Sequence, residues 1–328
     1  MWQTDKPQDA IVENDSVFPD WLFPTSVESW SEYRRLVELG QSRMRGAKVV
    51  ICGLARDVAD ILPQSIARIE RLGEHFADYR VVIYENDSRD ATPALLADWT
   101  ERNHRVQALR ERIGDPINPT ARCLRRAARM ANYRNRCLEV VRSQFADFDY
   151  VIVVDTDLQG GWSDDGVANT FGHEAWDFVG SNGIIFKRQG RDLNVPIQFD
   201  AWAFRRNGDF AALTTTAVNC LRWQRGESLA PVTSCFGGLG VYRMPALLAA
   251  RYAGWDCEHI PLHFAMRRNG FHRVFLNPSQ ITLYGRRHRS TDRVVIPILN
   301  GLARLRRVLS PQALAAPIAE SLCLGMKS

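Results

Sequence analysis

Tyr150-Val151-Ile152-Val153-Val154-Asp155-Thr156-Asp157 is the stretch of sequence that decides the fold class. Its apolar run is short and rich in β-branched residues, which is typical of a strand buried on both faces of a parallel sheet. The run stops abruptly at two aspartates. In open α/β sheets ligands bind beyond the carboxyl ends of the strands, so we expect Asp155 and Asp157 to line a functional site.

The segments that precede this strand alternate between strand and helix patterns. A β-branched run at 49–53 is followed by helical spacing of apolar residues over 60–72. A second strand at 80–85 is followed by a helix over 94–102, for which we expect Thr92 to be the N-cap. This alternation predicts an α/β fold with a mixed, mostly parallel sheet flanked by helices.

Three further helices are predicted from periodicity. Residues 26–45 read as an amphipathic helix that Gly46 ends, residues 119–145 as a long and very basic helix, and residues 258–269 as a helix in the second half. The rest of the second half is aromatic-rich and less regular. We expect it to be an elaborated, acceptor-binding part of the same domain.

These patterns predict three consecutive regions. They are an N-terminal helical extension (1–45), one large domain (46–290) and a C-terminal amphipathic tail (291–328). The resemblance described below implies that the large domain is a catalytic domain, with a nucleotide-binding half at 46–157 and an acceptor half at 158–290. The tail interleaves leucines with arginines. It therefore fits either a solvated helix or a peripheral contact with an anionic membrane.

Composition bounds the class of protein. The 328 residues are 45% hydrophobic, enough for a substantial core, and 42 basic against 37 acidic residues give a net charge of only +5. The seven cysteines form no CxxC pair. The N-terminus lacks a signal-peptide pattern, and no apolar run is as long as a membrane span, which needs about 18 residues. We expect a cytoplasmic enzyme, with peripheral attachment to the inner face of the membrane as a further option.

Asp155 and Asp157 occupy alternate positions directly after the most hydrophobic strand. Two carboxylates placed in this way can converge on Mg²⁺ or Mn²⁺, which prefer oxygen ligands. Such an ion would neutralise the charge that builds up on a departing diphosphate. The competing interpretation is an ordinary surface turn that contains aspartates and binds no metal.

The end of the second strand is also polar. Glu85, Asn86 and Asp87 are suited to hydrogen bonds with a ribose or a base edge, and an Asx-type turn capping the next helix is compatible with this role. The basic helix carries more cations than nearby acids can pair, so some of them are candidates for binding phosphate. These cations are Arg122, Arg125, Arg126, Arg129, Arg134 and Arg136.

Six segments in order resemble nucleotide-sugar glycosyltransferases of the GT-A type. The sequence is similar to the cryptococcal mannosyltransferase-like group, glycosyltransferase family 69, and to related bacterial capsule enzymes, over about Val49 to Asn277. The segments are Tyr84-Glu85-Asn86-Asp87-Ser88, Met130-Ala131-Asn132-Tyr133-Arg134-Asn135, Asp155-Thr156-Asp157, Phe199-Asp200-Ala201-Trp202-Ala203, Ser234-Cys235-Phe236-Gly237-Gly238 and Cys257-Glu258-His259.

This resemblance implies a set of roles. The donor nucleotide would be held by Glu85, Asn86, Asp87, Arg129, Arg134, Asn135, Asp155 and Trp202, and the metal by Asp155 and Asp157. Asp200 would accept hydrogen bonds from sugar hydroxyls in a pocket that Trp202 helps to form. These assignments come from the resemblance and not from spacing.

Glu258 is the candidate carboxylate at the reacting centre. In an inverting enzyme Glu258 would deprotonate the acceptor hydroxyl, and in a retaining enzyme it would bind the acceptor or stabilise developing charge. The alternative is a structural role as the N-cap of a helix. His259 and His263 share a helical face, so a metal site is considered there. His288 would close over the diphosphate as a further metal ligand, or lie in an exposed basic turn.

The expected function is transfer of a hexose or deoxyhexose from a nucleoside diphosphate sugar to a glycan or lipid-linked acceptor in surface polysaccharide synthesis. The reaction would be mannosyltransferase-like and would use Mn²⁺ or Mg²⁺. A sugar-phosphate nucleotidyltransferase is an alternative, although the first strand lacks the Gly-rich signature loop. A basic nucleic-acid-binding protein is another, although no RNP-type motif or zinc module is found, so we expect no nucleic-acid partner. The last alternative is a degenerate transferase that binds a sugar nucleotide without turnover.

Overall fold

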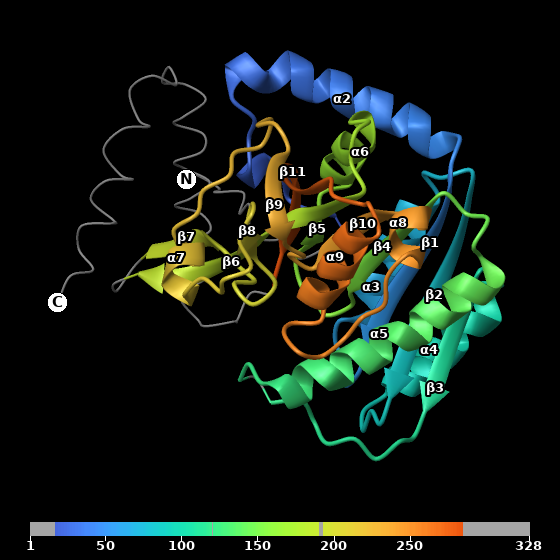
Figure 1. Cartoon of the computed structure of the whole chain (residues 1–328). Helices are drawn as coiled ribbons and strands as arrows, with labels where there is room; N and C mark the ends of the chain where they lie inside the picture. Colours follow the sequence, from blue (N-terminus) through green and yellow to red (C-terminus); the bar gives the residue numbers. More distant parts are fainter. Residues whose placement is uncertain (1–16, 120, 190–192, 285–328) are drawn as a thin grey trace, which may run out of the picture.

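The computed structural model describes residues 17–119, 121–189 and 193–284, and it has the expected α/β architecture (Figure 1). The helices are η1 (Asp20–Leu22), α2 (Val27–Arg45), α3 (Leu62–Gly73), α4 (Thr92–Arg102), α5 (Leu124–Gln144), α6 (Asp164–Gly172), α7 (Thr215–Asn219), α8 (Met244–Leu248) and α9 (His259–Arg268). The expected tail and His288 lie outside the described residues.

The strands build one mixed and mostly parallel sheet. They are β1 (Lys48–Ala55), β2 (Asp78–Asn86), β3 (Val106–Glu111), β4 (Tyr150–Asp155), β5 (Gly161–Trp162), β6 (Phe178–Gln189), β7 (Leu193–Gln198), β8 (Arg205–Arg206), β9 (Ala230–Ser234), β10 (Leu239–Arg243) and β11 (Val274–Leu283).

The strand order is β3-β2-β1-β4-β10-β6-β11-β9-β8, with β5 paired to β11 and β7 to β6. The first four strands of this order run parallel, whereas β10 is antiparallel to both β4 and β6. Strand β11 then runs parallel to β6. The carboxyl ends of β1, β2 and β4 therefore meet at one edge of the sheet, which is where the acidic and polar residues were expected.

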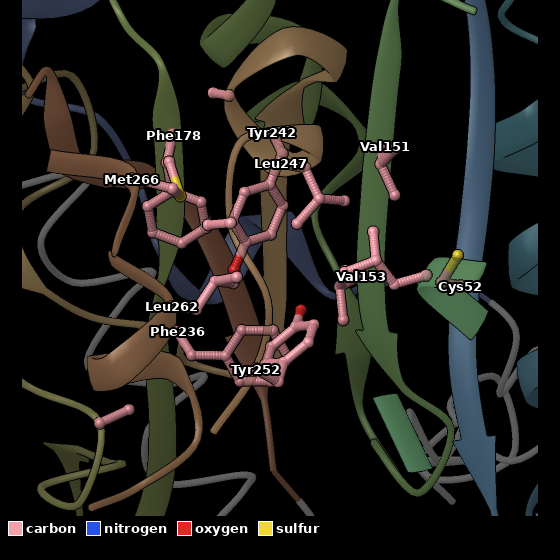
Figure 2. Close-up of a cluster of buried hydrophobic side chains, with 14 of the residues drawn as sticks. Cys52, Val151, Val153, Phe178, Phe236, Tyr242, Leu247, Tyr252, Leu262 and Met266 are labelled. Atoms are coloured by element: carbon pink, nitrogen blue, oxygen red, sulfur yellow. The ribbon is translucent and has the colours of Figure 1, made fainter. Parts of the chain in front are cut away.

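Alternation along each strand divides the core into two layers. Val151 and Val153 of β4 face the layer that contains α5, α8 and α9, together with Cys52 of β1 (Figure 2). Ile152 and Val154 face the opposite layer, with α2, α3, α4 and α6. Because both faces are covered, the central strands carry apolar residues at successive positions and not only at alternate ones, which is the pattern that predicted them.

The aromatic part of the first layer lies between the sheet and α9. In Figure 2, Phe178 and Tyr242 approach Met266, and Phe236 lies beside Tyr252. The Phe178 and Tyr242 ring centroids are 4.4 Å apart. This packing fixes α9 and, with it, the residues at its N-terminus.

Local details depart from the sequence expectations. Thr92 is the first residue of α4 and not its cap, because Asp90 Oδ1 accepts from the Thr92 amide (2.9 Å) while the Thr92 hydroxyl accepts from the Val58 amide (2.9 Å). Strand β3 was not expected from the sequence. The basic helix starts at Leu124 and not near Pro119, because Cys123 is extended.

Helix α2, expected as an N-terminal extension, packs closely along α6. Its Ser26 cap accepts from the Ser29 amide (3.2 Å). A Cβ placed on Gly40 would lie 1.7 Å from the Ala168 carbonyl oxygen, so only glycine permits this approach of the two helices. Of the helices in the described ranges, none combines the length and the apolar character needed to cross a bilayer.

We predict that Gly40→Ala destabilises the protein, although Gly→Ala inside a helix normally stabilises by up to about 1 kcal/mol. The added methyl must push α2 away from α6, and overpacking of this kind costs about 1–3 kcal/mol. Urea denaturation of the variant measures the change. Gly46→Ala at the end of the same helix is the matched control, because its Cβ would have no neighbour nearer than 3.7 Å. Equal stability of Gly40→Ala and wild type would contradict the prediction.

Candidate active site

The end of β4 presents two carboxylates because the residue between them points inward. Thr156 is buried; its hydroxyl donates to the Leu54 carbonyl (2.7 Å), and its own carbonyl accepts from Ser65 Oγ (2.6 Å). Asp155 and Asp157 flank it, with Asp155 half-buried and Asp157 exposed. The strand alternation therefore turns Thr156 toward α3 and Asp155 toward the α5 side of the sheet.

A buried guanidinium joins Asp155 to a second carboxylate. Arg134 of α5 donates through Nη2 to Asp155 (3.2 Å) and through Nε to Glu258 (3.0 Å), and its side chain is 5% exposed. Its guanidinium carbon lies 5.0 Å from the centre of the Phe236 ring. Burial by itself would lower the pKa of Arg134, but the charges of Glu258 and Asp155 outweigh it and raise this pKa.

Tyr284 completes the surroundings of Asp155 and was not among the expected site residues. Its hydroxyl donates to Asp155 Oδ2 (2.9 Å). Desolvation raises the pKa of Asp155 to about 7, against the opposing effect of the Arg134 charge. Gly238, whose carbonyl accepts from the Asp155 amide (2.8 Å), has φ +87°, and a Cβ there would lie 2.7 Å from the Tyr284 hydroxyl. The glycine thus allows the tyrosine to reach the carboxylate.

Asp200 lies close enough to the same group to interact with Asp155 and Glu258 through its charge. Its backbone is in the left-handed region (φ 73°), where Oδ2 accepts from the Gly237 amide (3.1 Å). Desolvation raises the pKa of Asp200 to about 6, although backbone hydrogen bonds oppose it. Asp200 can therefore exchange a proton near neutral pH.

Trp202 follows two residues later and is half-buried. The guanidinium carbon of Arg126 lies 5.2 Å from its ring centre. The Trp202 ring thus packs against the protein near Asp200 and remains partly exposed to solvent, so it could contact a bound ligand.

Glu258 stands at the N-cap position of α9, but its side chain makes no capping hydrogen bond. The carboxylate is buried and directed to Arg134, and its other oxygen accepts only a long contact from Cys257 Sγ (3.7 Å). The helix-cap interpretation is therefore wrong. Glu258 is instead paired with Arg134.

The polar residues after β2 organise a neighbouring loop. Asp87 (φ 55°) accepts from the backbone amides of Ile113 (3.1 Å), Gly114 (3.0 Å) and Asp115 (3.0 Å). The hydrogen bond from Asn86 and these amides lower the pKa of Asp87. Capping of α4 by Asp87 is thus wrong, since the structure gives that contact to Asp90.

Glu85 and Asn86 are buried at the same strand end. Glu85 Oε1 accepts from the Ser88 amide (2.9 Å), so it closes the turn after β2. Arg56, at the end of β1, donates to the Asp115 carbonyl (2.7 Å) and joins the loop to the neighbouring strand. The loop at 113–115 is held next to the carboxyl ends of β1 and β2.

The remaining residues expected at the nucleotide are on α5. Asn135 exchanges two hydrogen bonds with the Tyr252 backbone (3.0 and 3.1 Å), which joins α5 to the loop before α9. Arg129 is half-buried, and its Nε is buried without a hydrogen-bond partner among the described residues. Arg134 and Asn135 thus have protein partners.

The histidine pair on α9 is part of the core. His263 contacts Ser234 Oγ through Nδ1 (2.9 Å) and the Tyr242 hydroxyl through Nε2 (3.3 Å), so both ring nitrogens are engaged. His259 stacks on Phe236 with centroids 3.9 Å apart. Burial lowers the pKa of both, to about 3 for His263. Their arrangement is that of neutral core residues.

The described residues contain no group of three or more His, Cys, Asp or Glu side chains arranged to hold a metal ion. Asp155 and Asp157 by themselves offer carboxylate oxygens at an accessible strand end. Mg²⁺ and Mn²⁺ commonly take one or two protein carboxylates and complete their shell with phosphate oxygens and water. The donor set therefore fits an ion that arrives with a phosphorylated ligand.

No family model matches the chain, and no curated protein matches it. Among solved structures it is similar to the mannosyltransferase PcManGT from Pyrobaculum calidifontis in complex with GDP-Man and Mn²⁺ (12% identity, 91% of this chain and 89% of that chain, TM-score 0.45). It is also similar to glucosyl-3-phosphoglycerate synthase from Mycobacterium tuberculosis with Mn²⁺ and UDP (13%, 82% and 80%, TM-score 0.43). At these identities no residue role passes from one chain to another.

We predict that Arg134→Met lowers the free energy of unfolding by about 3–5 kcal/mol, because it leaves buried carboxylates without their counter-ion. Urea denaturation without added metal measures the loss. Arg251→Met is the matched control: this arginine pairs with Glu139 where both side chains are more than half exposed, so its loss is expected to cost less than about 1 kcal/mol. Equal costs for the two variants would show that the Arg134 bridge contributes little.

A second prediction concerns pH. The pKa of His263 is depressed in the folded state, so its contribution to stability is present above the unfolded pKa of about 6.5 and is lost as pH falls toward 3. From pH 7 to 5 the wild type should lose about 2 kcal/mol more than His263→Gln. Urea titrations at several pH values measure this difference, with the exposed His104→Gln as control. Parallel profiles for wild type and His263→Gln would contradict a neutral His263.

Proposed function

We propose that the protein is a metal-dependent glycosyltransferase that uses a nucleoside diphosphate sugar. The observation that carries the proposal is the position of Asp155 at the end of β4, joined to Glu258 by Arg134 and beside the exposed Asp157. Carboxylates gathered at the carboxyl ends of parallel strands are suited to a cation and to the phosphates that it carries.

Asp155 and Asp157 are the residues that would hold Mn²⁺ or Mg²⁺. When bound, the ion would supply Lewis-acid stabilisation of the departing diphosphate. The raised pKa of Asp155 reflects desolvation that a nearby cation relieves. Arg134 and Tyr284 fix the orientation of this carboxylate from both of its oxygens.

The donor's nucleoside would lie over the ends of β1 and β2. Asp87 and Asn86 fix the loop at 113–115, which leaves backbone groups of this loop beside the strand ends. Arg129, with a buried Nε that lacks a protein partner in the described ranges, is the arginine we assign to a phosphate. Charge-assisted hydrogen bonds between guanidinium and phosphate are strong enough to orient the donor.

The acceptor side is assigned to Asp200 and Trp202. Trp202 offers an apolar ring to a sugar, and Asp200 has a pKa raised to about 6, close to the value that suits a general base. Glu258 is buried and paired with Arg134, so we assign it to positioning that arginine. Asp200 is then the group that accepts the proton of an acceptor hydroxyl.

The finer function follows the sequence expectation. We propose a hexose as the transferred group, in a mannosyltransferase-like reaction, and a glycan or lipid-linked acceptor in surface polysaccharide synthesis. Arg134 of α5 has carboxylate partners, and Arg122, just before this helix, donates to Thr215 Oγ1 (3.1 Å), so part of the basic segment already has partners within the protein. This favours a transferase over a nucleic-acid-binding protein.

The test is a thermal-shift panel with UDP, GDP, CMP, dTDP and ADP, each with and without Mn²⁺. We expect one nucleotide to raise Tm by about 5 °C at 100-fold over Kd, only with Mn²⁺. Asp157→Asn should remove the shift without changing the Tm of the free protein. Asp147→Asn is the matched control, because this exposed carboxylate precedes β4 at the opposite end of the strand.

Three outcomes would contradict the proposal. If no nucleotide changes Tm at saturating concentration, the protein does not bind nucleotides. If the nucleotide raises the Tm of Asp157→Asn as much as that of the wild type, Asp157 is not part of the metal site. Release of pyrophosphate from a nucleoside triphosphate and a sugar phosphate would identify a nucleotidyltransferase. Release of nucleoside diphosphate from a sugar nucleotide, dependent on Mn²⁺, is the expected turnover.

A further inference from the structure

Three exposed aromatic side chains from separate segments contact one another near the proposed acceptor side. Phe210, Trp255 and Phe264 are 42%, 56% and 38% exposed. The Phe264 ring centre lies 5.4 Å from that of Phe210 and 6.1 Å from that of Trp255, in edge-to-face arrangements. We call these three residues the aromatic surface. Clustered apolar side chains in contact with water are characteristic of interaction sites, whereas single ones are not.

A buried arginine holds the aromatic surface together. Arg205 is 2% exposed, and it donates to the Phe210 carbonyl (2.8 Å) and to the Asp256 carboxylate (2.8 Å). It also donates to the backbone carbonyls of Trp202 (3.0 Å) and Phe204 (2.8 Å). One guanidinium thus joins the segment that carries Phe210 to the segment that carries Trp255. The rings are therefore positioned before any partner binds.

Helix α5 extends this surface with an exposed leucine. Gly254 packs directly on Ala128, since a Cβ on Gly254 would lie 2.3 Å from the Ala128 Cα. Leu124 lies one turn before Ala128 on the same helical face and is 62% exposed. Figure 1 shows the loop between α8 and α9 running alongside α5. The residue before Trp255 thus packs on α5 one turn from Leu124.

The charges around the aromatic surface are mainly positive. Arg125 is exposed beside Leu124, Arg268 is exposed one turn after Phe264, and Arg206 is exposed on the segment leading to Phe210. The acids next to the rings in the sequence are Asp209, which accepts from the Ala211 amide (2.8 Å), and Asp256, which is paired with Arg205. Glu258 is buried and paired with Arg134. Arginines around exposed aromatic rings complement an anionic lipid headgroup layer.

Each segment of this surface also carries a residue of the candidate active site. Asp200 and Trp202 precede Phe210, Glu258 follows Trp255 by three residues, and Arg134 lies on α5. A partner bound to the aromatic surface would therefore lie at the border of the site. A flat bilayer is large enough to contact all of these segments at the same time.

We propose that the aromatic surface, with Leu124 and the arginines around it, docks onto an anionic lipid bilayer. This inference rests on the proposed function, because it assigns the acceptor to the lipid-linked class. Rings packed edge to face with an aliphatic neighbour provide apolar area for the headgroup boundary, and the arginines contact lipid phosphates. The attachment lies within the described residues and is separate from the one expected for the tail at 291–328.

The test uses the full chain and sedimentation with vesicles of phosphatidylcholine, alone or with phosphatidylglycerol. Wild type should bind the anionic vesicles, and the binding should weaken as salt rises. The double variant Trp255→Ala/Phe264→Ala should bind at least about tenfold more weakly. Trp30→Ala is the matched control, because Trp30 is 54% exposed on α2, and it should bind as wild type does.

Arg125→Glu is a second variant, placed on the exposed face of α5 and independent of the aromatic packing. It should weaken binding to anionic vesicles and shift its salt dependence. If the double variant does not fold, which its melting curve reveals, Arg125→Glu and the single variant Trp255→Ala provide the test. Loss of binding in these variants with retention in Trp30→Ala supports the proposal.

Several results would overturn it. The first is that the wild type does not bind anionic vesicles, and the second is that the double variant binds them as well as the wild type does. The third is that the double variant and Trp30→Ala lose binding equally. The fourth is self-association of the wild type that depends on concentration and that the double variant abolishes. The last would identify a second copy of the chain as the partner. The nucleotide panel does not involve vesicles. If a nucleotide raises Tm in the presence of Mn²⁺ but the protein does not bind vesicles, the membrane-docking proposal is rejected and the proposed function is not.

Discussion

The ion pairs of Arg134 are the interaction on which the arrangement of the site depends. A guanidinium that is almost fully removed from water needs charged partners, and Glu258 and Asp155 provide them at Nε and Nη2. Each carboxylate belongs to a different part of the fold, at the end of β4 and at the start of α9. Phe236 beneath the guanidinium excludes water from the bridge. The position of Asp155 is thus determined by α5 and α9 as much as by its own strand.

The central fold followed from local patterns. The strand ending at Asp155 and the helix starting after Glu258 were both predicted within a few residues, because buried parallel strands and amphipathic helices leave a periodic signature in the sequence. Thr92 was misassigned because the N-cap of α4 is Ala91, and the Thr92 hydroxyl accepts instead from the Val58 amide of another segment. The weakly apolar strand β3 (Val106–Glu111) carries little periodicity and was missed.

The site could be predicted only at its strand ends. Asp155 and Asp157 follow directly from the rule that ligands bind where parallel strands end. The partners of Asp155 could not be inferred in this way, since Arg134 was expected to face phosphate and Tyr284 lies 129 residues further along the chain. Hydrogen bonds over such separations leave no local pattern. The position of Tyr284 directly after β11 was the one available signal.

The insertion of β10 between β4 and β6 has a consequence for how the protein acquires its site during folding. β4 pairs with β10 through Val154 and Leu239, and Arg134 meets Glu258 across 124 residues. Contacts of this range form only after large chain loops have closed, which slows folding. A nascent chain would therefore assemble the parallel strands β1 to β4 well before it has a complete set of carboxylates. Ligand binding should appear as a late event in refolding, after most of the secondary structure has formed.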